Sequence, residues 1–96
     1  MPFEVVIDPV AQQDLGRIRK YDRVTIIETI ERLLTTKATD ESVRAIKKLD
    51  PPTPTRFRLR IGEFRVYYDV DESEQRVIVL MVREKGTQTT AEVTQE

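Results

Sequence analysis

A strict alternation of arginine with apolar residues between positions 56 and 61 constrains this chain more than any other feature. Arginine stands at positions 56, 58 and 60, and the residues that follow each of them are Phe57, Leu59 and Ile61. Successive side chains of a β-strand point to opposite faces of the sheet, so this period of two is typical of a strand. The pattern predicts a strand with one cationic face and one face that packs into a core.

Two further strands are predicted directly after the first. Gly62 and Glu63 form a turn, because glycine adopts backbone angles that other residues avoid. The return strand, residues 64–70, again places apolar residues on one face, while Arg65, Tyr67 and Asp69 lie on the other. A polar turn at residues 71–75 precedes residues 77–82, which are apolar on both sides and therefore typical of a central strand covered on two faces.

The first half of the chain predicts a strand and two helices. Residues 3–7 are rich in β-branched residues and favour a strand. Asp8-Pro9 is a helix start, and apolar residues then recur at helical spacing up to Tyr21-Asp22, where the first helix is expected to end. Asp22 is expected to cap the second helix, whose apolar stripe comprises Ile26, Ile27, Ile30, Leu33 and Leu34.

These elements together indicate an α+β fold. We expect an N-terminal strand, an antiparallel helical hairpin packed on one face, and then a three-stranded antiparallel sheet. Residues 43–49 are compatible with either a helical turn or a short edge strand, and the prolines within residues 50–55 make a rigid connection. The whole of residues 1–96 is expected to be one domain, with residues 86–96 as a flexible tail.

Composition excludes several kinds of chemistry. The 96 residues include no cysteine and no histidine, which excludes disulfides, thiolate nucleophiles and a histidine general base, and argues against a zinc site of the usual kind. No apolar run is long enough to cross a bilayer and no signal peptide is visible, so a soluble cytoplasmic protein without a cofactor or metal is expected.

Charge is concentrated in the middle of the chain although the net charge is only −1. Residues 43–65 carry seven basic and two acidic side chains, whereas residues 1–42 carry six and eight, and residues 66–96 carry three and seven. A basic block on one strand face predicts a site for a polyanion. The alternative is a solvated sheet face whose arginines pair with Asp69 or Glu63, and the charges alone leave both interpretations open.

A longer pattern resembles the RelE/ParE superfamily of bacterial toxins, and RelE-like members above all. It comprises Lys48-Leu49, the proline-rich spacer, the segment RLRIGEFRVYY at residues 58–68, and the apolar strand that ends in Val82-Arg83-Glu84-Lys85. The resemblance extends from Phe3 to about Lys85. It implies the βααβββ fold of RelE, the toxin half of a toxin–antitoxin system with a part in plasmid stabilization, and a RelB-like antitoxin partner bound in a hetero-oligomer.

The resemblance implies two different activities. RelE-like toxins are metal-independent endoribonucleases (mRNA interferases), RNA-binding hydrolases that cut messenger RNA on the ribosome and so inhibit translation. ParE-like toxins poison DNA gyrase. We expect the first activity, with the ribosome and messenger RNA as partners; the alternatives are gyrase inhibition and a chain that has lost activity but still binds its antitoxin.

The site residues follow from the resemblance position by position. Arginine suits phosphate because its planar fork makes bidentate, charge-assisted hydrogen bonds. The catalytic positions of RNA-cleaving members correspond here to Arg56, Arg58, Arg65, Arg83 and Lys85. The expected RNA-binding residues are Lys47, Lys48, Arg60 and Tyr67.

Two departures from the RelE pattern bear on the chemistry. Arg56 and Arg58 stand where well-known RNA-cleaving members have lysine, and a guanidinium keeps its proton and is a poor general base. Proton transfer would then fall to Lys47, Lys48, Lys85 or Glu84, or catalysis would depend on positioning and charge alone. The family's C-terminal tyrosine has no counterpart within residues 86–96, which leaves Tyr67 as the substitute for stacking on a base.

Overall fold

The structure is a computed structural model that describes residues 2–85. The tail predicted for residues 86–96 lies outside this range. The helices and strands are, in chain order, β1 (Glu4–Ile7), α1 (Pro9–Gly16), α2 (Lys20–Lys37), β2 (Ile46–Lys48), β3 (Phe57–Ile61), β4 (Phe64–Asp71) and β5 (Arg76–Glu84).

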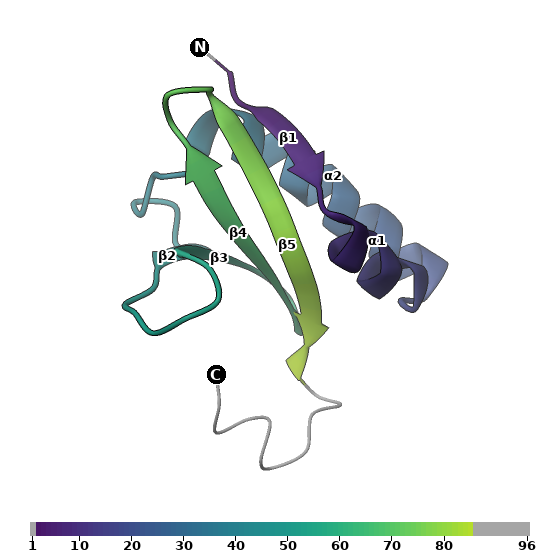
Figure 1. Cartoon of the computed structure of the whole chain (residues 1–96). Helices are drawn as coiled ribbons and strands as arrows, with labels where there is room; N and C mark the ends of the chain where they lie inside the picture. The colour runs from purple at the N-terminus through teal and green to yellow at the C-terminus, as the bar shows by residue number, and fades with distance from the viewer. Residues whose placement is uncertain (1, 86–96) are drawn as a thin grey trace.

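The strands form one five-stranded sheet in the order β1-β5-β4-β3-β2 (Figure 1). β1 runs parallel to β5, and the other neighbours are antiparallel. The predicted α+β fold is confirmed, with its N-terminal strand, two helices and antiparallel β3–β4–β5 unit. The structure adds that β1 joins the same sheet beside β5. It also decides the question left open at residues 43–49, because Ile46–Lys48 is a short edge strand paired with β3.

The helices begin and end at positions that differ in part from the prediction. α1 begins as expected, since the Asp8 carboxylate accepts a hydrogen bond from the Val10 N–H at 3.0 Å. It ends at Gly16 rather than near Tyr21, because its last amides turn tightly onto carbonyls three residues back. α2 therefore starts at Lys20, and the expected cap Asp22 lies inside its first turn. The Asp22 Oδ2 atom is 3.6 Å from Arg19 Nε.

The core lies between the sheet and the helices, and α2 runs behind the sheet in Figure 1. Alternate strand residues supply the sheet side of this core, and every second residue of β4 from Phe64 to Val70 is buried in it. Tyr68 is fully buried and its hydroxyl donates to the Ala38 carbonyl at 2.7 Å. Burial raises the pKa of Tyr68, so this phenol stays protonated and serves packing rather than proton transfer.

A bulge in β5 changes which of its residues face the core. Tyr67 pairs with Met81 but Tyr68 pairs with Val79, so Leu80 is an extra residue on β5. Val79 and Val82 are consequently both buried although they are three positions apart. The expectation that β5 is covered on two faces is wrong for residues 2–85. β5 is an interior strand of the sheet, but the helices lie on one face only. Met81, on the other face, is half-buried.

Candidate anion-binding face

The face of the sheet opposite the helices, called the open face here, carries the basic side chains of β2, β3, β4 and β5. Residues paired across neighbouring strands share a face, so the register fixes their arrangement. Arg60 pairs with Arg65, and Arg65 pairs with Arg83. These three residues, the arginine row, cross three adjacent strands. Lys47 and Arg58 are paired in the neighbouring row and share the open face.

The β3–β4 hairpin brings the first two members of the row together. Gly62 has φ +57°, a left-handed conformation that glycine adopts without a steric penalty, and the chain reverses within residues 62–63. Arg60 and Arg65 form the second residue pair of the ladder, counted from this turn. The register therefore places Arg60 and Arg65 opposite each other on the same face of the sheet.

Arg56 lies at the other end of the open face and does not join the row. Its backbone N–H donates to Asp69 Oδ1 at 2.7 Å, and its Nε lies 3.9 Å from the same carboxylate oxygen. Its Nη2 donates to the Val70 carbonyl, and the guanidinium lies 6.0 Å from the centre of the Phe57 ring. Arg56, one of the expected catalytic residues, therefore lies apart from the arginine row, and the ion-pair alternative with Asp69 holds at this position.

Arg83, the outer member of the row, is held by α1. Its Nη1 donates to Asp14 Oδ2 at 2.7 Å and to the Val82 carbonyl at 3.1 Å. The same Asp14 oxygen accepts the Val82 N–H at 2.9 Å. The Asp14 side chain is only 11% exposed, whereas that of Arg83 is 43% exposed. The Arg83 cation thus has a fixed partner and remains accessible.

Arg58 and Arg60 have no carboxylate partner within residues 2–85. Arg60 is exposed, and Arg58 is half-buried beside it. The Nε of Arg58 is buried and makes no hydrogen bond in the part of the chain that the structure describes. A buried donor without an acceptor costs roughly 1–3 kcal/mol, so Arg58 retains a cation at an energetic cost.

The lysines expected to assist the arginines separate in the structure. Lys47 pairs with Arg58 and shares the open face, whereas Lys48 pairs with Phe57 and shares the helix side. Lys85 follows β5, is exposed, and donates its backbone N–H to the Glu63 carbonyl at 2.8 Å. Glu84 pairs with Phe64 and so stands on the helix side of the sheet. Among these four candidates for proton transfer, Lys47 has the ladder position next to an arginine of the open face.

Tyr67 shares a face with the arginines but is buried. It pairs with Arg58 on one side and with Met81 on the other, and only 8% of it is exposed. The prediction placed it on the exposed side of the sheet. It does share the face of the arginines, but its side chain is buried there. In this conformation Tyr67 does not present a ring for stacking on a nucleotide base.

Carboxylates gather at the end of the open face remote from the arginine row. Arg76 Nε lies 3.1 Å from Glu4 Oε1, and Asp71 pairs with Arg76 in the ladder. Hydrogen bonds from the Ser73 hydroxyl at 2.8 Å and from the Glu74 N–H at 3.1 Å lower the pKa of Asp71 below its ordinary value. Asp71 is therefore ionised. The arginines of this end, Arg56 and Arg76, each pair with a carboxylate, so it is called the compensated end here.

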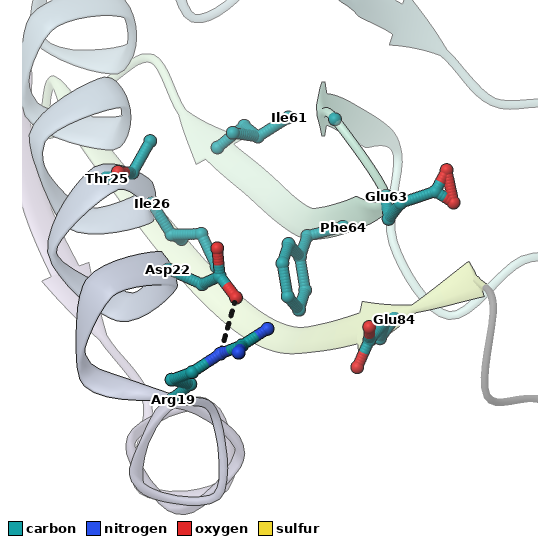
Figure 2. A pocket seen from close by; sticks show the side chains of 9 residues that line it. Arg19, Asp22, Thr25, Ile26, Ile61, Glu63, Phe64 and Glu84 are labelled. Atoms are coloured by element: carbon teal, nitrogen blue, oxygen red, sulfur yellow. Dashed lines mark ion pairs between the residues drawn. The ribbon is translucent and has the colours of Figure 1, made fainter.

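A separate hollow of about 390 Å³ lies between the first half of α2 and the β3–β4 hairpin (Figure 2). Ile26, Ile61 and Phe64 line it, and the Arg19–Asp22 ion pair stands at its rim. Glu84, a candidate for proton transfer, also lines it, but no member of the arginine row does. The hollow and the arginine row are therefore distinct features.

The arrangement suits the binding of an extended anion. Lys47, Arg58 and the arginine row place cations on adjacent rigid strands, and side chains on strands are held more firmly than side chains on loops. Reasoning from the sequence did not identify Asp14, which holds Arg83 from 69 residues away. One signal was present: Asp14 falls between Ala11 and Leu15 at the helical spacing of the buried stripe, where a carboxylate is unusual.

Residues 2–85 offer neither a metal centre nor a membrane span. No three Asp, Glu, His or Cys side chains in this range cluster closely enough to hold a metal ion. Neither of its helices has the length and apolar character needed to span a membrane.

Comparison with known proteins identifies a family. Residues 5–88 match the family described as "ParE toxin of type II toxin-antitoxin system, parDE". Comparison of the sequence with curated proteins gives no significant match.

Solved structures of RelE toxins share the fold. The toxin–antitoxin complex RelBE2 from Mycobacterium tuberculosis matches with a TM-score of 0.69 and 23% identity over 88% of this chain and 99% of that chain. The archaeal RelE–RelB complex from Pyrococcus horikoshii matches with a TM-score of 0.70 and 22% identity over 92% and 100%. The isolated Escherichia coli RelE toxin matches with a TM-score of 0.69 and 14% identity over 97% and 94%.

Proposed function

The chain belongs to the ParE toxin family of type II toxin–antitoxin systems, and we propose that its open face is an RNA-cleaving site that inhibits translation on the ribosome. A cognate RelB-like antitoxin would neutralise it, as the RelE–RelB complexes of similar fold suggest. One observation carries the proposal: Lys47, Arg58 and the arginine row lie on one face, and Arg58 and Arg60 make no ion pair within residues 2–85.

The residues suit one reaction in particular. The ribose 2′-hydroxyl gives its proton to a solvent water, the 2′-oxygen attacks the adjacent phosphorus, and the bond from phosphorus to the 5′-oxygen breaks. The products are a 2′,3′-cyclic phosphate and a 5′-hydroxyl. Negative charge grows on the phosphoryl oxygens in the transition state, and preorganised cations stabilise it. Arg58, Arg60 and Arg65 supply those cations. The departing 5′-oxygen needs a proton, and the ammonium of Lys47 is the group beside Arg58 that can donate one.

A second candidate function is inhibition of DNA gyrase. The matching family model is that of ParE, and arginine replaces lysine at Arg56 and Arg58, where a general base would be useful. In this case the open face would bind a protein or DNA surface and no bond would be cleaved.

Controlled expression separates the two functions. The wild-type chain and an Arg65→Ala variant are induced in separate cultures, and growth, transcript integrity and DNA supercoiling are followed. The proposed function predicts growth arrest with transcripts cut within reading frames, and loss of both effects in Arg65→Ala. Intact transcripts with a DNA-damage response and inhibited supercoiling would instead establish gyrase inhibition. A chain that causes no arrest yet binds its antitoxin would contradict both.

Arg76→Ala is the matched control for Arg65→Ala. Arg76 also lies on the open face, but it pairs with Glu4 at the compensated end. We expect Arg76→Ala to arrest growth and cut transcripts like the wild type. Equal loss of activity in both variants would show that arginine on the open face matters for folding rather than for the site.

A further inference from the structure

The most informative contact outside the proposed set of cations joins α1 to the arginine row. The Asp14 carboxylate oxygen accepts two hydrogen bonds, one from the Val82 N–H at 2.9 Å and one from Arg83 Nη1 at 2.7 Å. Asp14 is nearly buried, with 11% of its side chain exposed. A buried carboxylate that bridges a sheet edge and a surface cation has either a structural or a functional role.

The structural role is clear from the topology. β1 pairs with β5 only as far as Ile7 and Val79, so the edge of β5 beyond that point has no neighbouring strand on this side within residues 2–85. The Val82 N–H emerges there and needs an acceptor, because a buried amide without one is costly. Asp14 provides the acceptor. A neutral asparagine would provide the same oxygen, so capping this amide does not by itself require a charge.

The negative charge of Asp14 is explained by its contact with Arg83. Its Nη1 is fixed by the Asp14 carboxylate and by the Val82 carbonyl at 3.1 Å, so one edge of the guanidinium is committed to the protein. The side chain nevertheless remains 43% exposed and stands opposite Arg65 in the row. A guanidinium held on one edge keeps a fixed orientation, and a cation that is already ordered loses less entropy when it binds an anion.

We propose that Asp14 is a positioning residue that orients Arg83 toward the RNA phosphate bound by the arginine row. This inference rests on the proposed function. Asp14 does not contact the RNA; it acts through Arg83. Arg83 then forms the outer end of a preorganised row, and Arg60 and Arg65 form its inner part.

The test is a double-mutant cycle of Asp14→Asn and Arg83→Ala in the full chain. Purified variants are assayed for cleavage of ribosome-bound messenger RNA and for binding of a short single-stranded RNA, and thermal unfolding is measured for each. Asparagine is chosen because its amide oxygen can still accept the Val82 N–H, so the fold should be kept. We expect Asp14→Asn to slow cleavage by about tenfold or more, since misplacement by about an ångström has effects of this size.

Two results distinguish positioning from a purely structural role. Asp14→Asn should cause no additional loss in the Arg83→Ala background, because a residue that acts through Arg83 has nothing left to orient. Asp22→Asn is the control: Asp22 also pairs with an arginine, Arg19 at 3.6 Å, but on α2. This variant should cleave at the wild-type rate.

Several outcomes would overturn the inference. If Asp14→Asn cleaves at the wild-type rate while Arg83→Ala is slow, the inference is overturned and the proposed function stands. The same holds if Asp14→Asn slows cleavage equally in the wild-type and Arg83→Ala backgrounds. Tighter RNA binding by Asp14→Asn would overturn it too, by showing that Asp14 withdraws Arg83 from the site. A wild-type chain that neither cleaves nor binds RNA, or an active Arg65→Ala variant, would instead overturn the proposed function and this inference with it.

Discussion

The two ends of the open face contain the same residue type in opposite electrostatic settings. At one end, Arg56 pairs with Asp69 and Arg76 pairs with Glu4. At the other end, next to the Gly62 turn, Arg58 and Arg60 have no carboxylate partner within residues 2–85. The difference shows that alternation along a strand decides the face on which an arginine lies, whereas the neighbouring strands decide whether its charge remains available.

The two ends of the open face would receive an anion differently. A phosphate chain approaching the compensated end would meet Asp69, Asp71 and Glu4 as well as arginine, and the attraction and repulsion would partly cancel. At the other end, called the uncompensated end here because Arg58 and Arg60 have no carboxylate partner within residues 2–85, it would meet those two cations. It would also meet Arg83, whose partner Asp14 is nearly buried. The open face therefore has a direction, from a neutral end to a cationic one.

The largest effect is expected from removing two cations at the uncompensated end. We expect the double variant Arg58→Ala/Arg60→Ala to bind single-stranded RNA at least about tenfold more weakly than the wild type. The slope of log affinity against log salt should also fall by roughly 0.7 for each phosphate that the variant no longer neutralises. Fluorescence anisotropy over a range of KCl concentrations measures both quantities.

The matched control for that pair is Arg56→Ala/Arg76→Ala, which removes the same formal charge from the compensated end. At low salt it should weaken binding by no more than about fourfold, or about twofold for each exposed pair broken, and it should leave the salt slope nearly unchanged. Equal weakening in the two double variants would contradict the distinction between the ends, because net charge alone would then explain binding.

A smaller effect on stability is expected from Arg58→Met. The Nε of Arg58 is buried without an acceptor in the described part of the chain, and methionine keeps much of the length without a polar atom to satisfy. The free energy of unfolding should stay the same or rise by about 1 kcal/mol. Arg56→Met should instead lower it by about 1 kcal/mol, because the Arg56 guanidinium donates to the Val70 carbonyl. Urea unfolding of the two variants measures both free energies. A larger loss of stability in Arg58→Met than in Arg56→Met would contradict the assignment of an unsatisfied buried donor to Arg58.

The smallest effect is expected from Asp69→Asn, which turns the compensated end into a partly cationic one. Asparagine can still accept the Arg56 N–H, but it no longer balances the guanidinium charge. We expect RNA affinity to rise by about twofold at low salt, since exposed pairs contribute only about 0.2–1 kcal/mol. The rise should disappear near 0.5 M salt, where charges are screened beyond about 4–5 Å. A rise that persists at high salt would point to a rearranged strand instead.

Much of the fold follows from local patterns in the sequence. The alternation of residues 56–61 and the glycine turn after it predicted β3, β4 and their shared cationic face, because strand period and turn chemistry are local properties. Helix α1 began where Asp8 and Pro9 indicated. Its end was misplaced, since the apolar stripe continues to Ile18 although the helix stops at Gly16.

The candidate site was less predictable because it depends on contacts between distant residues. The approach of Arg60 to Arg65 was predictable from one hairpin. The pairing of Arg83 with Asp14 joins residues on opposite halves of the chain, and no local rule specifies it. The bulge at Leu80 depends likewise on how β5 packs, and it changes the faces of the residues that follow.

The central claim is that anions bind at the uncompensated end of the open face, and NMR of the arginine side chains tests it most directly. The Nε–Hε signals of Arg56, Arg58, Arg60 and Arg76 would be followed while a short single-stranded RNA is added. The account predicts that the Arg58 and Arg60 signals shift in a saturable way and that those of Arg56 and Arg76 stay in place. Shifts at Arg56 and Arg76 with unchanged Arg58 and Arg60 signals would contradict it.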